Sequence, residues 1–269
     1  MSQVWHDLLF AHWPVPLQQL QKLVPPKLKI DTYDGEAWIG VIPFRISDIK
    51  FRGFSAMPWV SAFTELNVRT YVKFNGKPGV YFFSLDADSR FNVKVARLWY
   101  HLPYFYSRML IERDGETVLF SSRRENAEFR GRYQPLGQTF RAERGSLAHW
   151  LTERYCLFAE DAHQNIVCGE IHHRPWLLQN AEAAIEVNTM TQPLAIRLPD
   201  SPPVLHFARR IEVLFWPPKK ANRLSHQPNE PVDDVEGRSG PGKPAGVGLH
   251  GRETGLVVEE PVNLVSKHG

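Results

Sequence analysis

The chain of 269 residues carries a formal net charge of +3, and 43% of its residues are hydrophobic and 12% aromatic. A chain of this length holds one large all-β domain or two small ones, with enough apolar side chains for a sizeable core. The weak net charge gives no argument for a nucleic acid or an anionic membrane as partner. No run approaches the roughly 18 apolar residues of a membrane span, and no signal-peptide pattern is visible, which predicts a cytoplasmic protein.

The two cysteines, Cys156 and Cys168, flank a predicted hairpin turn and can therefore lie close together. In a chain without a secretion signal, the sequence favours free thiols over a disulfide. The chain has no paired-cysteine or histidine-rich metal spacing, no G-x-S-x-G elbow and no G-x-G-x-x-G turn. The sequence therefore predicts neither a metal nor a cofactor.

The first 30 residues combine a short apolar segment with a helix. Pro14 and Pro16 can open that helix, and Pro25-Pro26 ends it. His12 is of a metal-ligand type, but its spacing from other such residues matches no known metal motif. A packed or hydrogen-bonded histidine is the favoured interpretation.

Residues 62–74, AFTELNVRTYVKF, alternate between two kinds of side chain along a predicted strand. One face is apolar, and the other carries Glu65, Asn67 and Arg69 between aromatic residues. In a simple sandwich the polar face would meet solvent, whereas in a barrel or cone it would line the lumen. Glu65 and Arg69 can also form a plain ion pair on the strand. Our hypothesis is that this face looks inward, because the apolar face needs a cover of its own.

Asn75-Gly76 predicts a hairpin turn that leads into a buried strand at 79–85. Polar residues follow where that strand ends: Asp86, Asp88, Ser89 and Arg90. Polar side chains at the end of a buried strand are where a pocket would open. The same residues also suit turn chemistry and helix capping, and the sequence alone leaves both interpretations open.

Apolar residues then recur at helical spacing up to Pro103, which predicts a helix over 91–102. Lys94 lies on it, and a desolvated lysine can attack a carbonyl carbon. Lys94 also belongs to a basic stripe with Arg90, Arg97 and His101, a pattern typical of a solvated helix face.

Further strands are predicted from apolar and alternating runs joined by short turns. They cover residues 36–44, 104–112, 117–123, 125–133, 155–160, 165–172 and 204–215, and a helix capped by Ser146 runs to residue 155. Residues 45–61 and 134–145 have the composition of loops, and 181–190 fit a strand or a helix. The adjacent His172 and His173 would point to opposite faces of a strand, so at most one of them can join a given site.

Composition changes at residue 221, and the segment 221–269 contains no Phe, Trp or Tyr. Such a segment cannot bury enough apolar surface to offset the entropy of ordering, so the sequence predicts a disordered tail. Residues 237–243 match the spacing of a phosphate-binding loop. The next residue is Pro244 instead of Ser or Thr, and no strand or helix flanks the segment, so we reject that match.

Several runs taken in order resemble one known family. They are LLFAHWPVP, LVPPKLKIDTYDGEAWIGVIPF, FTELNVRTYV, GVYFFSLDADS, LPYFYSRM, LTERYCLF, IHHRPWLLQNAE and PPVLHFARRIEVLFW. Over residues 1–218 the chain resembles the YqjF-like family, domain-of-unknown-function family 2071. That family is similar to the acetoacetate decarboxylase-like superfamily, which implies a closed antiparallel β-cone around a central cavity.

The resemblance also has implications for the site. The cavity of the decarboxylase holds a Schiff-base lysine with a glutamate and an arginine nearby, and Glu65 takes the place of the strand glutamate. The lysine motif, a Lys-Lys pair after a Gly-Phe-Pro run, has no counterpart in this sequence. Lys94 follows the corresponding strand without that context.

The sequence as a whole predicts an α+β fold, mainly antiparallel β, with a closed barrel or cone over residues 1–220. The favoured function is binding of a small organic acid or carbonyl metabolite in a polar-lined cavity by Glu65, Asn67, Arg69, Asp86 and Arg90. One alternative is a lysine-dependent decarboxylase or related acyl-chemistry enzyme, with Glu65 and Lys94 as catalytic candidates. A second is a structural or protein-interaction domain. The sequence makes no prediction of oligomeric state.

Overall fold

The structure, a computed structural model, describes residues 1–50, 62–90, 93 and 102–221. These residues belong to one compact unit, Met1–Pro231. Residues 51–61 of the expected loop at 45–61, and residues 222–269 of the expected tail at 221–269, lie outside the described residues. So do most of the expected helix over 91–102 and its Lys94.

The described chain is rich in strands and contains only short helices. The strands are β1 (Ser2–Val15), β2 (Lys29–Ile30), β3 (Ala37–Lys50), β4 (Ala62–Phe74), β5 (Lys77–Ala87), β6 (Tyr104–Tyr106), β7 (Arg108–Asp114), β8 (Thr117–Arg124), β9 (Ala127–Phe140), β10 (Cys156–Glu160), β11 (Ile166–His172), β12 (Leu178–Asn188), β13 (Val204–Phe215) and β14 (Lys219–Lys220). The helices are α1 (Leu17–Gln21), α3 (Leu147–Thr152) and the 3-10 turn η2 (Gln192–Leu194). None of the helices in the described ranges is long and apolar enough to span a membrane.

Local turn and cap chemistry accounts for several of these boundaries. Asn75 and Gly76 join β4 to β5 with φ angles of 49° and 82°, a left-handed conformation that these two residue types tolerate best. Gly115 has a φ of 59° in the hairpin between β7 and β8. The Ser146 side chain accepts a hydrogen bond from the backbone N–H of His149 at 3.2 Å and so begins α3, as the sequence predicts.

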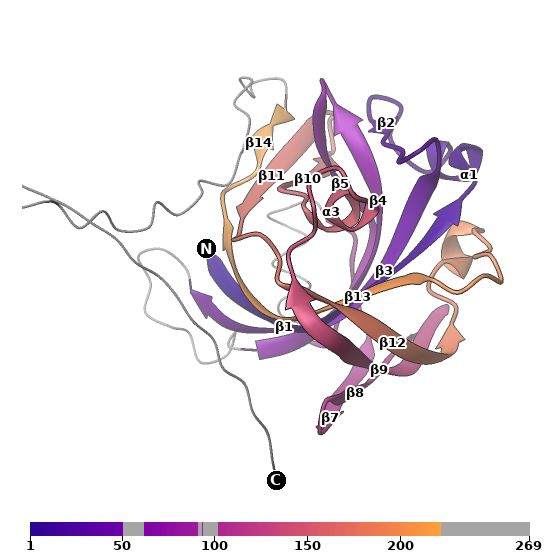
Figure 1. Ribbon diagram of the computed structural model, residues 1–269. Coiled ribbons are helices and arrows are strands. Elements are labelled where there is room, and N and C mark those ends of the chain that lie inside the picture. The colour runs from indigo at the N-terminus through magenta and orange to yellow at the C-terminus, as the bar shows by residue number, and fades with distance from the viewer. Residues whose placement is uncertain (51–61, 91–92, 94–101, 222–269) are drawn as a thin grey trace, which may run out of the picture. The chain divides into compact units, whose positions relative to one another are not determined.

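The main sheet closes on itself. Within the described residues, β11, β10, β5, β4, β3, β1 and β13 pair in that order, and β13 pairs again with β11. Most of these pairs are antiparallel. The strands therefore form a ring, with α3 on its inner side (Figure 1). This mainly antiparallel, cone-like sheet confirms the predicted fold class.

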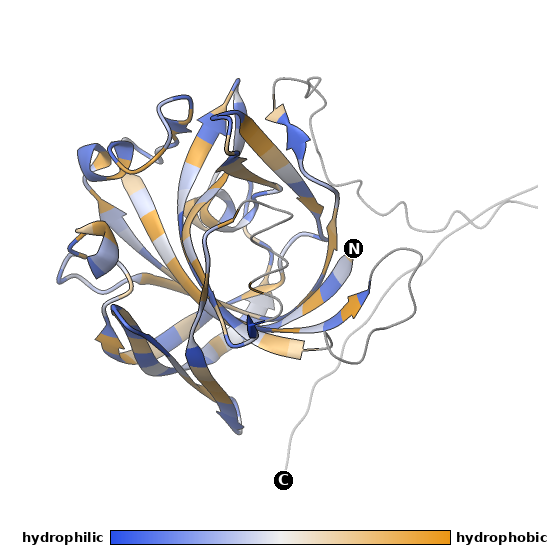
Figure 2. Cartoon of the chain, turned by 180° about the vertical axis from the view of Figure 1, so that it is seen from behind, coloured by the Kyte–Doolittle hydropathy of each residue, from blue (hydrophilic) through white to orange (hydrophobic). Residues whose placement is uncertain are grey.

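A second part of the sheet continues from β13 through β12, β9 and β8 to β7. Its apolar side chains, such as Phe120 and Phe129, pack with Leu66 and Val68 of β4 in one core cluster. Hydrophobic and hydrophilic residues alternate along several strands (Figure 2), as expected where each face has a different environment. The outer face of β4 is therefore covered by this extension.

One edge of β5 changes partners along its length, and we call this place the seam. β5 pairs in parallel with β10 through Val80 and Tyr81, and in parallel with β6 from Leu85 to Ala87. Residues 82–84 have no strand partner on this edge in the described structure. Gly79 allows the close approach of β10, because a Cβ there would lie 2.4 Å from the Cys156 carbonyl oxygen.

Two expected loops begin too early because strands continue into them, and a long first strand replaces the expected short apolar segment. β1 runs from Ser2 to Val15, with a register shift between His6 and Ala11 at which Asp7 adopts a φ of 53°. β3 extends into the expected loop at 45–61 as far as Lys50, and β9 extends into the expected loop at 134–145 as far as Phe140. Their neighbours β1 and β12 supply the hydrogen-bond partners, which no local pattern reveals. The segment left open at 181–190 lies largely in strand β12.

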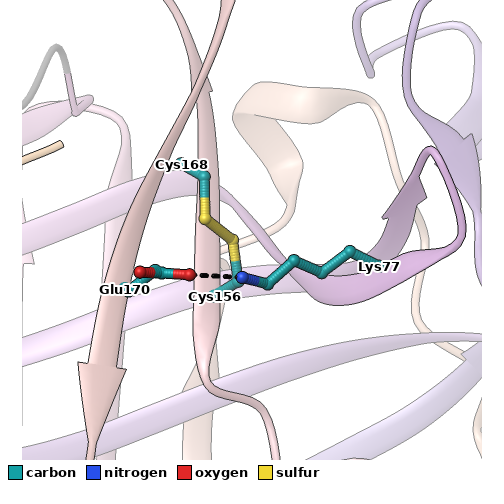
Figure 3. The surroundings of a disulfide bond; sticks show 4 residues. All are labelled: Lys77, Cys156, Cys168 and Glu170. Carbon is teal, nitrogen blue, oxygen red and sulfur yellow. Dashed lines mark hydrogen bonds and ion pairs between the residues drawn. A yellow bond between two sulfur atoms is a disulfide. The ribbon is translucent and has the colours of Figure 1, made fainter. Parts of the chain in front are cut away.

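The expectation of free thiols is also wrong, since Cys156 and Cys168 form a disulfide between β10 and β11 (Figure 3). The two strands pair antiparallel with Phe158 opposite Cys168, which brings the two Cα atoms to 6.1 Å. This separation suits a disulfide. Beside it, Lys77 of β5 forms an ion pair with Glu170 of β11.

The disulfide closes a loop with a sequence separation of 12 residues. We expect the double variant Cys156→Ser/Cys168→Ser to lose about 2–3 kcal/mol of unfolding free energy, because the open chain gains entropy in the unfolded state. Urea denaturation without reductant measures the difference. Reductant should bring the wild-type protein to the level of the variant, and equal stability of both proteins without reductant would contradict the prediction.

Candidate functional site

Both faces of β4 are buried, and the face that carries Glu65, Asn67, Arg69 and Tyr71 lies on the inner side of the ring. Glu65 and Asn67 are about 5% exposed or less, and Tyr71 is fully buried. The backbone carbonyl of Leu151 in α3 accepts hydrogen bonds from both Arg69 and Tyr71. Because α3 lies inside the ring, these contacts fix the inward direction of the face.

Arg69 is a partly buried cation whose contacts are neutral. Its guanidinium donates to the Leu151 carbonyl at 3.1 Å and to the Tyr71 hydroxyl at 3.4 Å, and lies 5.7 Å from the ring centre of Phe10. Its Nε is buried without a hydrogen-bond partner. Among the described residues, no carboxylate comes within ion-pair distance of Arg69. An uncompensated guanidinium of this kind favours a bound anion.

His12 of β1 stands next to this cation. Its Nε2 lies 2.6 Å from the Tyr71 hydroxyl, which donates its single proton to the Leu151 carbonyl. His12 Nε2 is therefore the donor to Tyr71, and the neutral ring keeps a lone pair on Nδ1, which is buried without a partner. Burial first, and then the charges of Arg69 and His206, hold the pKa of His12 well below its ordinary value.

The ring of His12 depends on a glycine on the next strand. Gly40 of β3 lies opposite His12 on one side and opposite Arg69 on the other. A Cβ at Gly40 would lie 2.9 Å from Cδ2 and Nε2 of His12, closer than such atoms approach. Because Gly40 has no side chain, the imidazole of His12 on β1 can lie over the backbone of β3 at this position.

Two further histidines face the same interior. His173 donates from Nδ1 to the Arg174 carbonyl at 2.8 Å, and burial lowers the pKa of His173 to about 4. His206 of β13 lies opposite Phe10, its Nδ1 is buried without a partner, and burial lowers the pKa of His206. His173 but not His172 is buried, in agreement with the prediction that only one of the pair can join a site.

Glu65 is held by a neutral partner and not by Arg69. The Tyr104 hydroxyl donates to its Oε2 at 3.1 Å, and no ion pair joins Glu65 and Arg69 in the described structure, so that interpretation is wrong. Burial raises the pKa of Glu65 to about 8, opposed by the hydrogen bond from Tyr104 and assisted by the charge of Asp86. Glu65 is therefore protonated at neutral pH. The adjacent Asn67 has its Oδ1 buried without a partner.

Two of the remaining predicted site residues, Asp86 and Arg90, do not join this group. Asp86 lies opposite Leu66, hence on the other face of the sheet, and binds Arg124 of β8 at 2.9 Å. Burial raises the pKa of Asp86 to about 6, against the opposing effect of Arg124. Arg90 is exposed, and its guanidinium lies 4.1 Å from the ring centre of Tyr106. Lys94 lies outside the described residues.

We define the inner polar cluster as His12, Glu65, Asn67, Arg69, Tyr71, His173 and His206. At neutral pH its histidines are neutral and its glutamic acid is protonated, so Arg69 supplies its only charge. The sequence signalled the β4 residues by alternation. It did not signal His173 and His206 as site residues, because the ring of strands brings them together from distant segments. Within the described ranges, no group of three or more His, Cys, Asp or Glu is arranged to hold a metal ion.

The profile of DUF2071, an uncharacterized conserved protein family, matches residues 2–212. A relative, the uncharacterized protein YqjF of Bacillus subtilis (strain 168), is 50% identical over 223 residues, which cover 82% of this chain and 92% of the relative. The chain belongs to the DUF2071 family. No described function comes with this membership, so the geometry of this DUF2071 protein has to carry the functional argument.

Solved structures of the acetoacetate decarboxylase-like type share the fold of this DUF2071 protein. The enduracididine biosynthesis enzyme MppR complexed with pyruvate aligns with a TM-score of 0.60 at 10% identity, over 81% of this chain and 89% of its own. An acetoacetate decarboxylase from Legionella pneumophila aligns with a TM-score of 0.56 at 11% identity, over 79% of this chain and 84% of its own. An acetoacetate decarboxylase-like enzyme from Sphingomonas wittichii RW1 aligns with a TM-score of 0.57 at 14% identity, over 81% of this chain and 91% of its own. At such identities the likeness concerns the fold alone.

The raised pKa of Glu65 makes stability depend on pH. The folded protein keeps a proton up to about pH 8 that the unfolded chain releases near its ordinary pKa of 4.5, so stability falls as pH rises between these values. Glu65→Gln removes this dependence. We expect the difference in unfolding free energy, variant minus wild type, to increase by on the order of 3 kcal/mol from pH 5 to pH 8.

Denaturant melts of both proteins at several pH values measure this gap. The control is Glu112→Gln, which changes an exposed carboxylate on β7 and should track the wild type. A gap between Glu65→Gln and wild type that stays constant across this pH range would show that Glu65 is already ionised.

Proposed function

We propose that this DUF2071 protein binds a small organic acid against the inner polar cluster, with Arg69 receiving the carboxylate. The observation that carries the proposal is the partly buried guanidinium without a carboxylate partner among the described residues. An arginine fork matches a carboxylate in two parallel hydrogen bonds, and the unpartnered Nε–H is one of the donors that such a bond uses.

The other members of the cluster suit the rest of such a ligand. A protonated Glu65 can donate its O–H to a carbonyl oxygen, which an ionised carboxylate cannot do. Asn67 Oδ1 and His12 Nδ1 offer acceptors that are buried and have no protein partner. Buried polar atoms without partners are costly, and a ligand that pairs with them would remove that cost.

The structural neighbours support this choice of ligand by analogy of fold. One structure of MppR is complexed with pyruvate, and other neighbours are acetoacetate decarboxylases. A small oxo acid is therefore the first class of ligand to test on this chain.

The test uses pyruvate and acetoacetate as probes, with binding measured by isothermal titration calorimetry. We expect Arg69→Met to weaken binding about ten- to hundredfold, because a charge-assisted hydrogen bond pair is lost. The control is Arg108→Met, which removes an exposed arginine of β7 and should bind like wild type. Equal binding by wild type and Arg69→Met, at matched folding by circular dichroism, would exclude Arg69 as the carboxylate partner.

Borohydride trapping separates binding from lysine-dependent catalysis. None of the lysines in the described ranges is buried, and Lys94 is the candidate that lies outside them. Binding without turnover predicts no covalent adduct after reduction with acetoacetate. An adduct at Lys94, identified by peptide mass spectrometry and lost in Lys94→Gln, would instead support a Schiff-base enzyme.

A further inference from the structure

A pocket opens at the seam of the ring, and none of its lining residues belongs to the inner polar cluster. It has a volume of about 520 Å³ and lies where β5 exchanges β10 for β6. We call it the seam pocket and define it by its lining residues, Tyr81, Phe82, Leu102, Pro103, Phe158, Ala159 and Glu160. A volume of this size is within the range of small-molecule sites.

The strand pairing explains why a pocket forms here. The parallel contact with β10 ends at Tyr81, and the contact with β6 begins at Leu85. Between them the edge of β5 has no neighbouring strand in the described structure, while Leu102-Pro103 approaches from the other side, where the Pro103 carbonyl accepts from the Leu85 N–H at 3.0 Å. The gap is therefore built by the topology and bounded by ordered backbone on both sides.

The lining combines one accessible phenol ring with one carboxylate. Tyr81 contributes the ring, and Glu160 contributes a carboxylate that pairs with no cation among the described residues. Phe158 is fully buried, and Phe82 faces the other side of β5, opposite Arg69, so neither offers a ring face with Tyr81. Burial, and then the charge of Glu160, raise the pKa of Tyr81, which places the carboxylate close to that phenol. Aromatic faces and a carboxylate both attract a positive charge.

We propose that the seam pocket binds a small organic cation, an amine or quaternary ammonium whose charge faces Glu160 and the ring of Tyr81. A cation gains both from the negative face of that ring and from Glu160, which has no counter-ion among the described residues. An anionic ligand would be repelled by Glu160, so the seam pocket does not serve the organic acid proposed for the inner polar cluster. This proposal does not depend on that function.

The test compares choline with 3,3-dimethyl-1-butanol, its neutral analogue of the same shape, by calorimetry on the full chain. We expect choline to bind at least about fivefold more tightly than the neutral analogue, as a cation–π contact with a partly desolvated charge provides. Glu160→Gln should weaken choline binding severalfold and leave the analogue unchanged. Glu112→Gln is the matched control, because it removes an exposed carboxylate on β7, far along the sheet order from β10.

Two further variants keep the outcome decisive. Tyr81→Leu keeps an apolar wall and should also weaken choline, whereas Arg69→Met should leave choline binding intact. Equal affinity for choline and its neutral analogue, no measurable binding of choline, or unchanged choline binding in Glu160→Gln would each overturn the proposal.

Discussion

The contact between β11 and β13 closes the ring with two pairs of facing residues, Ile171 with Phe215 and His172 with Leu214. The N-terminus reinforces it, since Phe215 exchanges backbone hydrogen bonds with Met1 at 2.7 and 3.1 Å. Without this closure the inner face of β4 would be one side of an open sheet and would be hydrated. The low exposure of Glu65, Asn67 and His12, and with it the pKa of each titratable group among them, follows from the closed ring.

Arg69 differs from Arg154 and Arg124 in that those two arginines form ion pairs with buried carboxylates. Asp31 pairs with Arg154 at 2.8 Å and with Lys73 at 2.7 Å, and Asp86 pairs with Arg124 at 2.9 Å. In each case a buried carboxylate compensates a cation, which is how folded proteins tolerate charges in their interior. In the part of the chain that the structure describes, the guanidinium of Arg69 contacts a carbonyl, a hydroxyl and aromatic rings but no carboxylate, and the carboxyl of Glu65 on its own strand is neutral at pH 7. The buried carboxylates of Asp31 and Asp86 thus form ion pairs between distant segments of the chain, whereas the guanidinium of Arg69 has no such partner among the described residues.

The sequence predicts what depends on neighbours along the chain. The turn at Asn75-Gly76, the cap at Ser146 and the two faces of β4 all follow from short-range patterns. What it missed depends on contacts between distant segments. The length of β9 depends on its pairing with β12, and the position of Asp86 depends on its ion pair with Arg124. The disulfide depends on the register in which β10 pairs with β11. For this reason the sequence predicted only the part of the inner polar cluster that lies on β4. The alternation along β4 identifies its own polar residues but says nothing about the histidines of β1 and β13 or about His173.

The absence of a side chain at Gly40 limits which residues this position and position 12 can accept together. His12, Gly40 and Arg69 occupy one row across three neighbouring strands, and the backbone at Gly40 has no positive φ that would itself require glycine. Its requirement is purely one of space beside the imidazole. The effects of substitutions at positions 12 and 40 are therefore coupled: a Cβ at position 40 collides with the imidazole of His12 in its present place, where it is bonded to Tyr71. The two positions form one steric unit, although they lie 28 positions apart in the sequence.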